Sequence, residues 1–233
     1  MSDALIKYSL QDEVATIHLN DGKANALSYD MIAALRSAIE RAESEARVAV
    51  IMGMPGKFCA GFDLKVMQQS MSAAVDLLKA GGALYIQMLR CSIPLLSACT
   101  GHAVAGGALL LAYSDYSIGV EGPFKLGLNE VHIGLPLPLL AIEITRHKLD
   151  PRRLNEATAL GRLYSPDEAQ KVGYLNETTS PEVFEEIVQK RAQAMTQMSP
   201  VAFRETKKRL WGELATQIEK TLESDLGAID EMH

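Results

Sequence analysis

A short run without a single polar side chain, Val48–Met52, constrains the fold of this chain most. A strand of this kind is buried on both faces, as in a parallel sheet that helices cover. Before it, apolar residues such as Met31, Leu35 and Ile39 recur on one helical face from Ser28 onward. The sequence therefore favours an α/β architecture.

The same alternation of strand and helix continues along the first 130 or so residues. The pattern predicts strands at Val14–Leu19, Ile93–Cys99 and Tyr116–Val120, with a helical stretch at Ala73–Arg90. Because parallel strands need long crossover connections, this order predicts a partly parallel sheet. A length of 233 residues is that of one large domain or of one domain with a small appendage.

The last third of the chain predicts a succession of helices from about Leu139. Four capping residues each precede a proline, which is the pattern of a helix start because proline lacks an N–H that would be unpaired there. The four pairs are Asp150-Pro151, Ser165-Pro166, Ser180-Pro181 and Ser199-Pro200. Glu168 completes a capping box with Ser165. We therefore expect a core at residues 1–180 and a C-terminal helical region at residues 181–233.

Composition excludes some classes of function. With 23 basic and 29 acidic residues the formal net charge is −6, which argues against a nucleic-acid surface or a polybasic membrane protein. The three cysteines form neither a paired framework nor a metal motif, so we expect a reduced chain and no metal. Residues Met1–Ala4 lack the basic-then-apolar pattern of a signal peptide. These features predict a cytoplasmic protein.

Two glycine-containing segments could expose backbone amides. Gly101–Ala108 joins the second buried strand to a short apolar helix, and glycines at a helix start leave N–H groups accessible to an anion or a developing oxyanion. The spacing fits neither the dinucleotide fingerprint nor the P-loop. Gly56–Leu64 is a similar loop after Val48–Met52. Close packing of a helix on a strand would explain the first segment equally well, and an ordinary strand-to-helix loop would look like the second.

The third segment, Phe124–Pro136, contains one acid among apolar residues. Burial disfavours the ionised form of a carboxylate, so we expect a raised pKa for Glu130, in the range useful to a general base. The alternative is a glutamate that only pairs with backbone groups.

Together the three segments resemble the enoyl-CoA hydratase/isomerase (crotonase) family. The most specific likeness lies in Ala60–Leu64, Gly101–Gly107 and Gly127–Gly134, which occur in the family's order and at similar spacings. The resemblance implies the ClpP/crotonase-like fold, a spiral of strand–strand–helix turns with a C-terminal helical region for trimerisation. It also implies a homotrimer or a hexamer of two trimers, and an acyl-CoA thioester as substrate with no other cofactor.

The resemblance further implies roles for individual residues. By motif position, the backbone N–H groups of Phe62 and Gly106 would hold the thioester oxygen. The hydratases' first glutamate, three residues after the donating glycine, is replaced here by Leu109, whereas the second corresponds to Glu130. A leucine cannot activate water, but one carboxylate can move a proton from carbon 2 to carbon 4. The motif thus favours a 3,2-enoyl-CoA isomerase.

Other chemistries stay open. A hydratase, or another lyase or hydrolase of the family, would differ in the residue that meets the acyl group, and Glu143 is then the best replacement acid. A non-catalytic acyl-CoA-binding protein is the alternative of another class, although an idle buried carboxylate costs stability. The residues expected to contact substrate are Lys23, Ala24, Ala26, Ala60, Gly61, Asp63, Leu64, Gly107 and Leu109.

The remaining polar residues carry weaker expectations. Lysines expected near the CoA phosphates are Lys23, Lys57 and Lys65, with Lys207 or Lys208 reaching in from a neighbouring subunit. Asp63 and Asp115 are expected to stabilise loops by hydrogen bonds. His132 would share a face with Glu130 in an extended segment, or be a hydrogen-bonded core histidine. Cys59 and Cys99 are expected to be small buried residues.

Overall fold

The larger of two sheets carries the strands that the sequence predicts. The computed structural model describes residues 5–230, and within them six strands are ordered β1-β2-β3-β5-β7-β9. The strand β1 is antiparallel to β2, and all later neighbours are parallel. The bounds are β1 Ile6–Gln11, β2 Val14–Leu19, β3 Val48–Met52, β5 Leu95–Cys99, β7 Tyr116–Val120 and β9 Glu177–Thr179.

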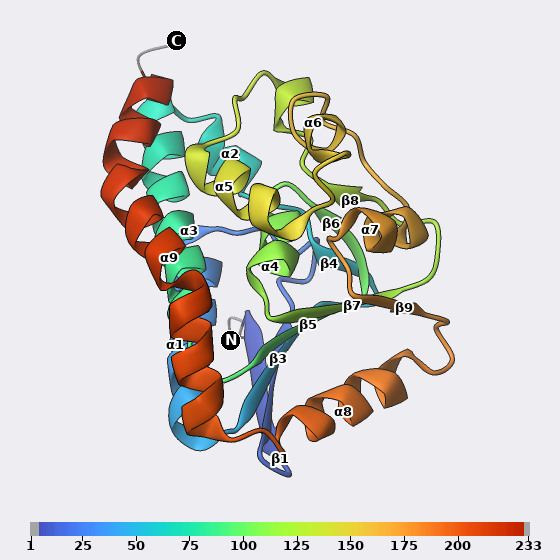
Figure 1. Cartoon of the computed structure of the whole chain (residues 1–233). Coiled ribbons are helices and arrows are strands. Elements are labelled where there is room, and N and C mark those ends of the chain that lie inside the picture. The colour runs from blue at the N-terminus through green and yellow to red at the C-terminus, as the bar shows by residue number, and fades with distance from the viewer. Residues whose placement is uncertain (1–4, 231–233) are drawn as a thin grey trace.

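A smaller parallel sheet, ordered β4-β6-β8, lies beside it (Figure 1). Its strands are β4 Gly56–Cys59, β6 Gly101–Val104 and β8 Leu126–Gly127. Each follows a strand of the larger sheet and leads to a helical segment, so the chain winds through three strand–strand–helix turns. This is the predicted crotonase-like spiral.

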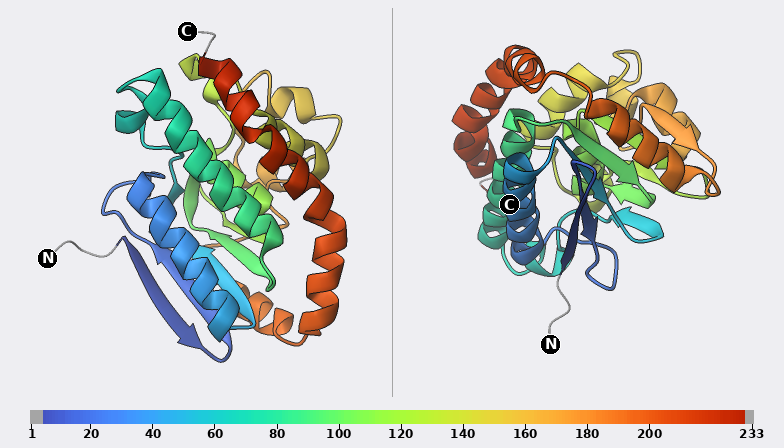
Figure 2. Two further views of the ribbon diagram at one scale, coloured as in Figure 1. Left: turned by 90° about the vertical axis from the view of Figure 1, so that its left-hand side faces the viewer. Right: turned by 90° about the horizontal axis from the view of Figure 1, so that it is seen from below.

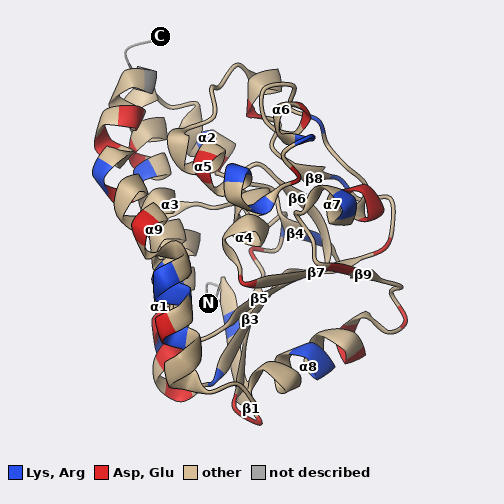
Figure 3. Ribbon diagram, in the orientation of Figure 1, with Lys and Arg blue, Asp and Glu red and all other residues tan. Residues whose placement is uncertain are grey.

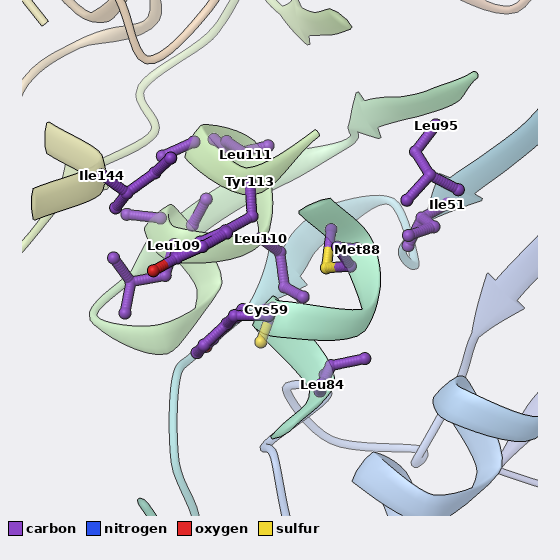
Figure 4. Close-up of a cluster of buried hydrophobic side chains, with 14 of the residues drawn as sticks. Ile51, Cys59, Leu84, Met88, Leu95, Leu109, Leu110, Leu111, Tyr113 and Ile144 are labelled. Carbon is purple, nitrogen blue, oxygen red and sulfur yellow. The ribbon is translucent and has the colours of Figure 1, made fainter. Parts of the chain in front are cut away.

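The helices begin with α1 (Tyr29–Glu45), which Ser28 caps by accepting a hydrogen bond from the Met31 N–H. The others are α2 Leu64–Met67, α3 Met71–Arg90, α4 Gly106–Tyr113, η1 Glu130–Ile133 (a 3₁₀ turn), α5 Leu139–Lys148, α6 Leu154–Ala157, α7 Pro166–Val172, α8 Phe184–Met195 and α9 Pro200–Asp230. Every residue of α4 is buried, and its side chains project in several directions into the core (Figure 4). Helix α4 therefore lies in the hydrophobic interior of the molecule.

Charged residues concentrate on the outer helices. Figure 3 shows none on α4, β3 or β5, whereas α8 and α9 carry both signs. None of the helices described within residues 5–230 is both long and apolar enough to span a bilayer. Residues Met1–Ala4, where the sequence shows no signal pattern, lie outside the described part of the chain.

The C-terminal helices pack on the spiral. Helix α8 covers one face of the larger sheet, where Phe184 and Val188 join Val48, Leu96 and Ile118 in one apolar cluster. Helix α9 lies along α3 (Figure 2). A role of residues 181–233 in trimerisation stays a prediction.

Two of the four proline-based helix starts are correct and two are wrong. Ser165 forms the predicted capping box with Glu168, and α9 starts at Pro200. After Asp150 and Ser180 the chain instead makes a turn, because the Arg153 and Val183 N–H groups bond back to the carbonyls of Asp150 and Ser180. The next helices, α6 and α8, begin at Leu154 and Phe184.

The expectation of helices alone after Leu139 is also wrong. The short strand β9 extends the larger sheet beside β7. Its residues, Glu-Thr-Thr, have no apolar alternation to indicate a strand.

Candidate active site

The three segments of the motif line one apolar cavity. It has a volume of about 140 Å³ and opens between the loop before α2, the start of α4, the 3₁₀ turn η1 and the start of α5. Among its described lining residues, only Asn129 and Glu130 have polar side chains. The lining consists of Ala60, Phe62, Leu64, Met67, Leu78, Val104, Ala105, Leu109, Asn129, Glu130, Ile133, Leu135, Pro136, Pro138 and Leu140.

Close backbone contact brings the two predicted amide donors to the same place. Gly61 has a φ of +87°, and a Cβ there would lie 2.8 Å from the Ala105 Cβ and 3.2 Å from the Gly106 nitrogen. Only glycine allows this approach, which places Phe62 beside the start of α4. Among the described residues, neither the Phe62 nor the Gly106 N–H donates a hydrogen bond to the protein.

The backbone just before Gly106 is strained. Ala105 has φ 54° and ψ −124°, a conformation that residues with a Cβ rarely adopt. This turn ends β6 and starts α4, and because Ala105 lines the cavity, the positive end of the helix dipole lies beside the cavity. Gly107 is required for packing, since a Cβ there would lie against the carbonyl oxygen of Cys59. The site can therefore accept an oxyanion.

Glu130 is the acid of the cavity. It begins η1, which Gly134 ends in the left-handed conformation, and the Leu135 N–H bonds to the Glu130 carbonyl at 3.0 Å. One carboxylate oxygen, Oε2, is buried without a hydrogen-bond partner. Burial raises the pKa of Glu130 to about 7, although the backbone amides of Glu130 and Asn129 lower it in part. The raised pKa is as expected from the sequence.

Leu109, at which the resemblance implies an acid in a hydratase, lines the same cavity. It is 2% exposed and lies on the first turns of α4 (Figure 4). Glu143 does not take its place, because it is absent from the cavity lining and pairs with Arg146 at 2.9 Å. The expectation that Glu143 is the replacement acid thus has no support in the geometry.

The predicted substrate-binding turn is tied to the amide loop. The Asp21 carboxylate accepts hydrogen bonds from the N–H groups of Lys23, Asn25 and Ala26. The Ala60 N–H bonds to the Ala24 carbonyl at 3.0 Å. Asn25, fully buried at φ 55°, donates to the Lys57 and Phe58 carbonyls. The fold thus places the turn against the loop that bears Phe62.

Several polar residues have structural rather than chemical contacts. Asp63 caps α2 by accepting from the Lys65 N–H at 2.9 Å, and Asp115 accepts from the Leu95 N–H at 2.9 Å, both as expected. Cys59 and Cys99 are buried, and burial raises the pKa of each thiol to about 12. They are the inert small residues that the sequence predicts.

Two expectations are wrong because of local packing. His132 is exposed and lies on the 3₁₀ turn, so it is neither a core histidine nor on an extended face with Glu130. Lys207 is 5% exposed and its Nζ lies 2.6 Å from Asp115 Oδ2, so it is not available to a CoA phosphate. Lys23, Lys57, Lys65 and Lys208 are exposed, and their contact with CoA stays a prediction.

Most of the cavity wall was not named residue by residue from the sequence. Met67 and Leu78 lie in the region 66–88, from which pocket residues were expected, whereas Leu135 and Leu140 have the sequence pattern of any core residue. Asn129 could have been identified as a lining residue from the sequence, because its polar amide stands beside Glu130 in the same apolar run.

Comparisons with known proteins identify relatives of this chain. The model of the family described as "Enoyl-CoA hydratase/isomerase" matches residues 9–232. Human mitochondrial enoyl-CoA delta isomerase 1 is 30% identical over 174 residues, which cover 72% of this chain and 58% of the human protein. Carnitinyl-CoA dehydratase of Salmonella heidelberg is 28% identical over 81% of this chain and 73% of its own length.

The fold is also that of solved relatives. The crystal structure of an enoyl-CoA hydratase/isomerase family protein from Pseudomonas syringae superposes with a TM-score of 0.94 at 36% identity, covering 97% of this chain and 98% of that one. The matched region includes all three segments that line the cavity. On the fold, the site and these matches, the chain belongs to the enoyl-CoA hydratase/isomerase family.

Proposed function

We propose that this protein is an acyl-CoA isomerase that converts 3-enoyl-CoA to 2-enoyl-CoA. The observation that carries the proposal is a single carboxylate, Glu130, in a cavity whose other described walls bear no acid. The similarity to an enoyl-CoA delta isomerase supports it. The reaction also requires a site that stabilises negative charge on the thioester oxygen, and the unpaired backbone amides of Phe62 and Gly106 supply it.

In this mechanism the thioester oxygen accepts hydrogen bonds from Phe62 N–H and Gly106 N–H. Glu130 removes a proton from carbon 2, the electron pair of that C–H bond forms a double bond between carbons 1 and 2, and the carbonyl π pair moves onto the thioester oxygen, which gives a dienolate. Each fixed donor lowers such a barrier by about 2.7–4 kcal/mol. The dienolate then collapses to a 2,3 double bond while carbon 4 takes the proton back from Glu130. No water is consumed.

A hydratase or dehydratase is the second candidate, favoured by the similarity to carnitinyl-CoA dehydratase. Hydration requires a group that orients and deprotonates water, and Leu109 offers none. A non-catalytic acyl-CoA-binding protein is disfavoured because Glu130 Oε2 is buried without a partner, which costs stability.

The substrate test compares two thioesters. With 3-hexenoyl-CoA we expect the ultraviolet absorbance of a conjugated enoyl thioester to appear, because the double bond moves into conjugation with the carbonyl. We expect the hydration of crotonyl-CoA to be at least about 100-fold slower than the isomerisation of 3-hexenoyl-CoA, since the water-activating acid is missing. Fast hydration of crotonyl-CoA without conversion of 3-hexenoyl-CoA would contradict the proposal.

The rate should depend on pH through Glu130. A base must be ionised to remove a proton, and burial raises the pKa of Glu130 to about 7. We therefore expect kcat/KM for 3-hexenoyl-CoA to rise about tenfold per pH unit below about 7 and to level off above it. A profile with its inflection near 4.5, the ordinary pKa of glutamate, would show that Glu130 is not the base in this environment.

The assembly and cellular location belong to the same proposal. We propose a homotrimer or hexamer in the cytoplasm that binds CoA phosphates through exposed lysines such as Lys23, Lys57 and Lys65. Acyl chain length would depend on the cavity wall, where Met67 and Leu78 meet residues of α5.

A further inference from the structure

A buried tyrosine on α3 contacts the helix that presents the Gly106 amide. Tyr85 is fully buried, and its hydroxyl donates a 2.9 Å hydrogen bond to the Gly106 carbonyl. A Cβ on Gly106 would lie 3.0 Å from that hydroxyl oxygen and 3.1 Å from Cε2 of Phe62. The first residue of α4 is thus enclosed by Tyr85 and Phe62.

Helix α3, which carries Tyr85, also contacts Phe62, the residue of the other amide donor. The Phe62 ring meets the Tyr85 ring edge to face, with centroids 6.5 Å apart and planes at 85°. It also packs over Gly81, one turn earlier on α3, so closely that a Cβ there would overlap the ring. Since Leu78 of α3 lines the cavity as well, this one helix contacts both amide-bearing segments and the wall of the cavity.

We propose that Tyr85 is a positioning residue that sets the spacing of the Phe62 and Gly106 amides. Its hydroxyl holds the peptide group between Gly106 and Gly107 in place. Its ring, together with the space left by the missing side chain of Gly81, holds the Phe62 ring in place. Two donors can polarise one thioester oxygen only when both point at the place where its charge develops. The inference rests on the proposed function, because it assumes that a thioester lies between these amides.

The hydroxyl has the properties that this role requires. Burial raises the pKa of Tyr85 well above its usual value, so the hydroxyl stays protonated and keeps donating. The ring also stacks on Tyr113, with centroids 4.8 Å apart and planes at 17°. Tyr113 is equally buried, but its hydroxyl donates to the Leu140 carbonyl at 2.8 Å rather than to Gly106. Tyr113 is therefore a matched control.

The experiment removes each hydroxyl in turn. Tyr85→Phe and Tyr113→Phe delete the same atom from stacked neighbours, so both should lower the melting temperature to a similar extent. We expect Tyr85→Phe alone to lower kcat on 3-hexenoyl-CoA by about tenfold or more, with KM changed less than about twofold. Gly81→Ala, which crowds the Phe62 ring without touching a hydroxyl, should lower kcat in the same way.

A spectroscopic readout separates this inference from the proposed function. In a bound saturated acyl-CoA carrying ¹³C at the thioester carbonyl, two aligned donors lower the infrared C=O stretch. We expect Tyr85→Phe to shift that band back toward its value in water and Tyr113→Phe to leave it unchanged.

Three outcomes would overturn the positioning role. One is an unshifted band with normal kcat in Tyr85→Phe, and another is an equal loss of kcat in both tyrosine variants. If Tyr85→Phe does not fold, an unshifted band in Gly81→Ala is the third. Absence of isomerase activity in the unaltered protein would reject the proposed function alone, because the carbonyl band still tests the alignment of the donors.

Discussion

Replacing Glu130 with glutamine is expected to lower kcat for 3-hexenoyl-CoA by about 10²–10⁴-fold. The substitution keeps the size of the side chain but removes the group that carries the proton between carbons 2 and 4. Glu130 is the acid of the cavity, and Leu109 cannot replace it. Since the Phe62 and Gly106 amides are untouched, binding of the thioester should persist.

The measurement pairs turnover with binding. Steady-state rates give kcat, and calorimetric titration with a saturated acyl-CoA gives Kd, which should change less than about threefold because no binding contact is removed. Glu143→Gln serves as the control, since Glu143 pairs with Arg146 outside the cavity lining, and it should keep normal turnover. Unchanged kcat in Glu130→Gln would reject Glu130 as the base.

The same variant should be more stable than the unaltered protein above pH 7. Burial raises the folded-state pKa of Glu130 from 4.5 to about 7, so within this window the folded chain holds a proton that the unfolded chain has released. The stability of the unaltered protein therefore falls as pH rises through the window, by roughly 3 kcal/mol in total. Glutamine does not titrate and avoids this loss, which denaturant unfolding at pH 5 and pH 8 would measure.

Replacing Lys207 with methionine is expected to lower the free energy of unfolding by about 3–5 kcal/mol. The Lys207 ammonium lies 2.6 Å from Asp115 Oδ2, and the two side chains are only 4% and 16% exposed. Methionine fills similar space but leaves the Asp115 carboxylate with the Leu95 N–H as its hydrogen-bond donor among the described residues, and with only the more distant charge of Lys148 near it. An unpaired buried charge is far more costly than a lost surface pair.

The adjacent lysine supplies the control. Lys208 is exposed on the same helix, so Lys208→Met should change the free energy of unfolding by less than about 0.5 kcal/mol. Adding Asp115→Asn to Lys207→Met should recover part of the loss, because the carboxylate that has lost its Lys207 partner is replaced by a neutral amide. Equal, small effects of the two lysine variants in denaturant unfolding would show that the pair contributes little to stability.

Local sequence patterns correctly predicted those strands and helix starts that are encoded by a few consecutive residues. The bounds of β2, β3 and β7 match the predicted strands, α1 begins directly after Ser28, where the helical pattern was predicted to start, and Ser165 forms the predicted capping box. Strand alternation, helical periodicity and capping chemistry each act over fewer than about ten residues, so they can be read from a single segment.

Elements that depend on distant partners were missed. The strands β6 and β8 are short and contain glycine, and each exists because a neighbouring strand supplies its hydrogen bonds. The 3₁₀ turn that carries Glu130 was not predicted. Asp150-Pro151 and Ser180-Pro181 show the same limit, since a local capping pattern also fits a turn.

The sequence by itself determined the α/β class and the leucine at position 109, because these follow from residue identity and spacing, and the resemblance of its three segments implied the family and its spiral fold. Only the tertiary structure decided that the loop bearing Phe62 packs against the start of α4, that Glu130 Oε2 is buried without a partner, and that Lys207 pairs with Asp115. The physical reason is that burial and electrostatic environment arise from segments far apart in the chain. A side chain's pKa and partners therefore depend on packing that no local pattern encodes.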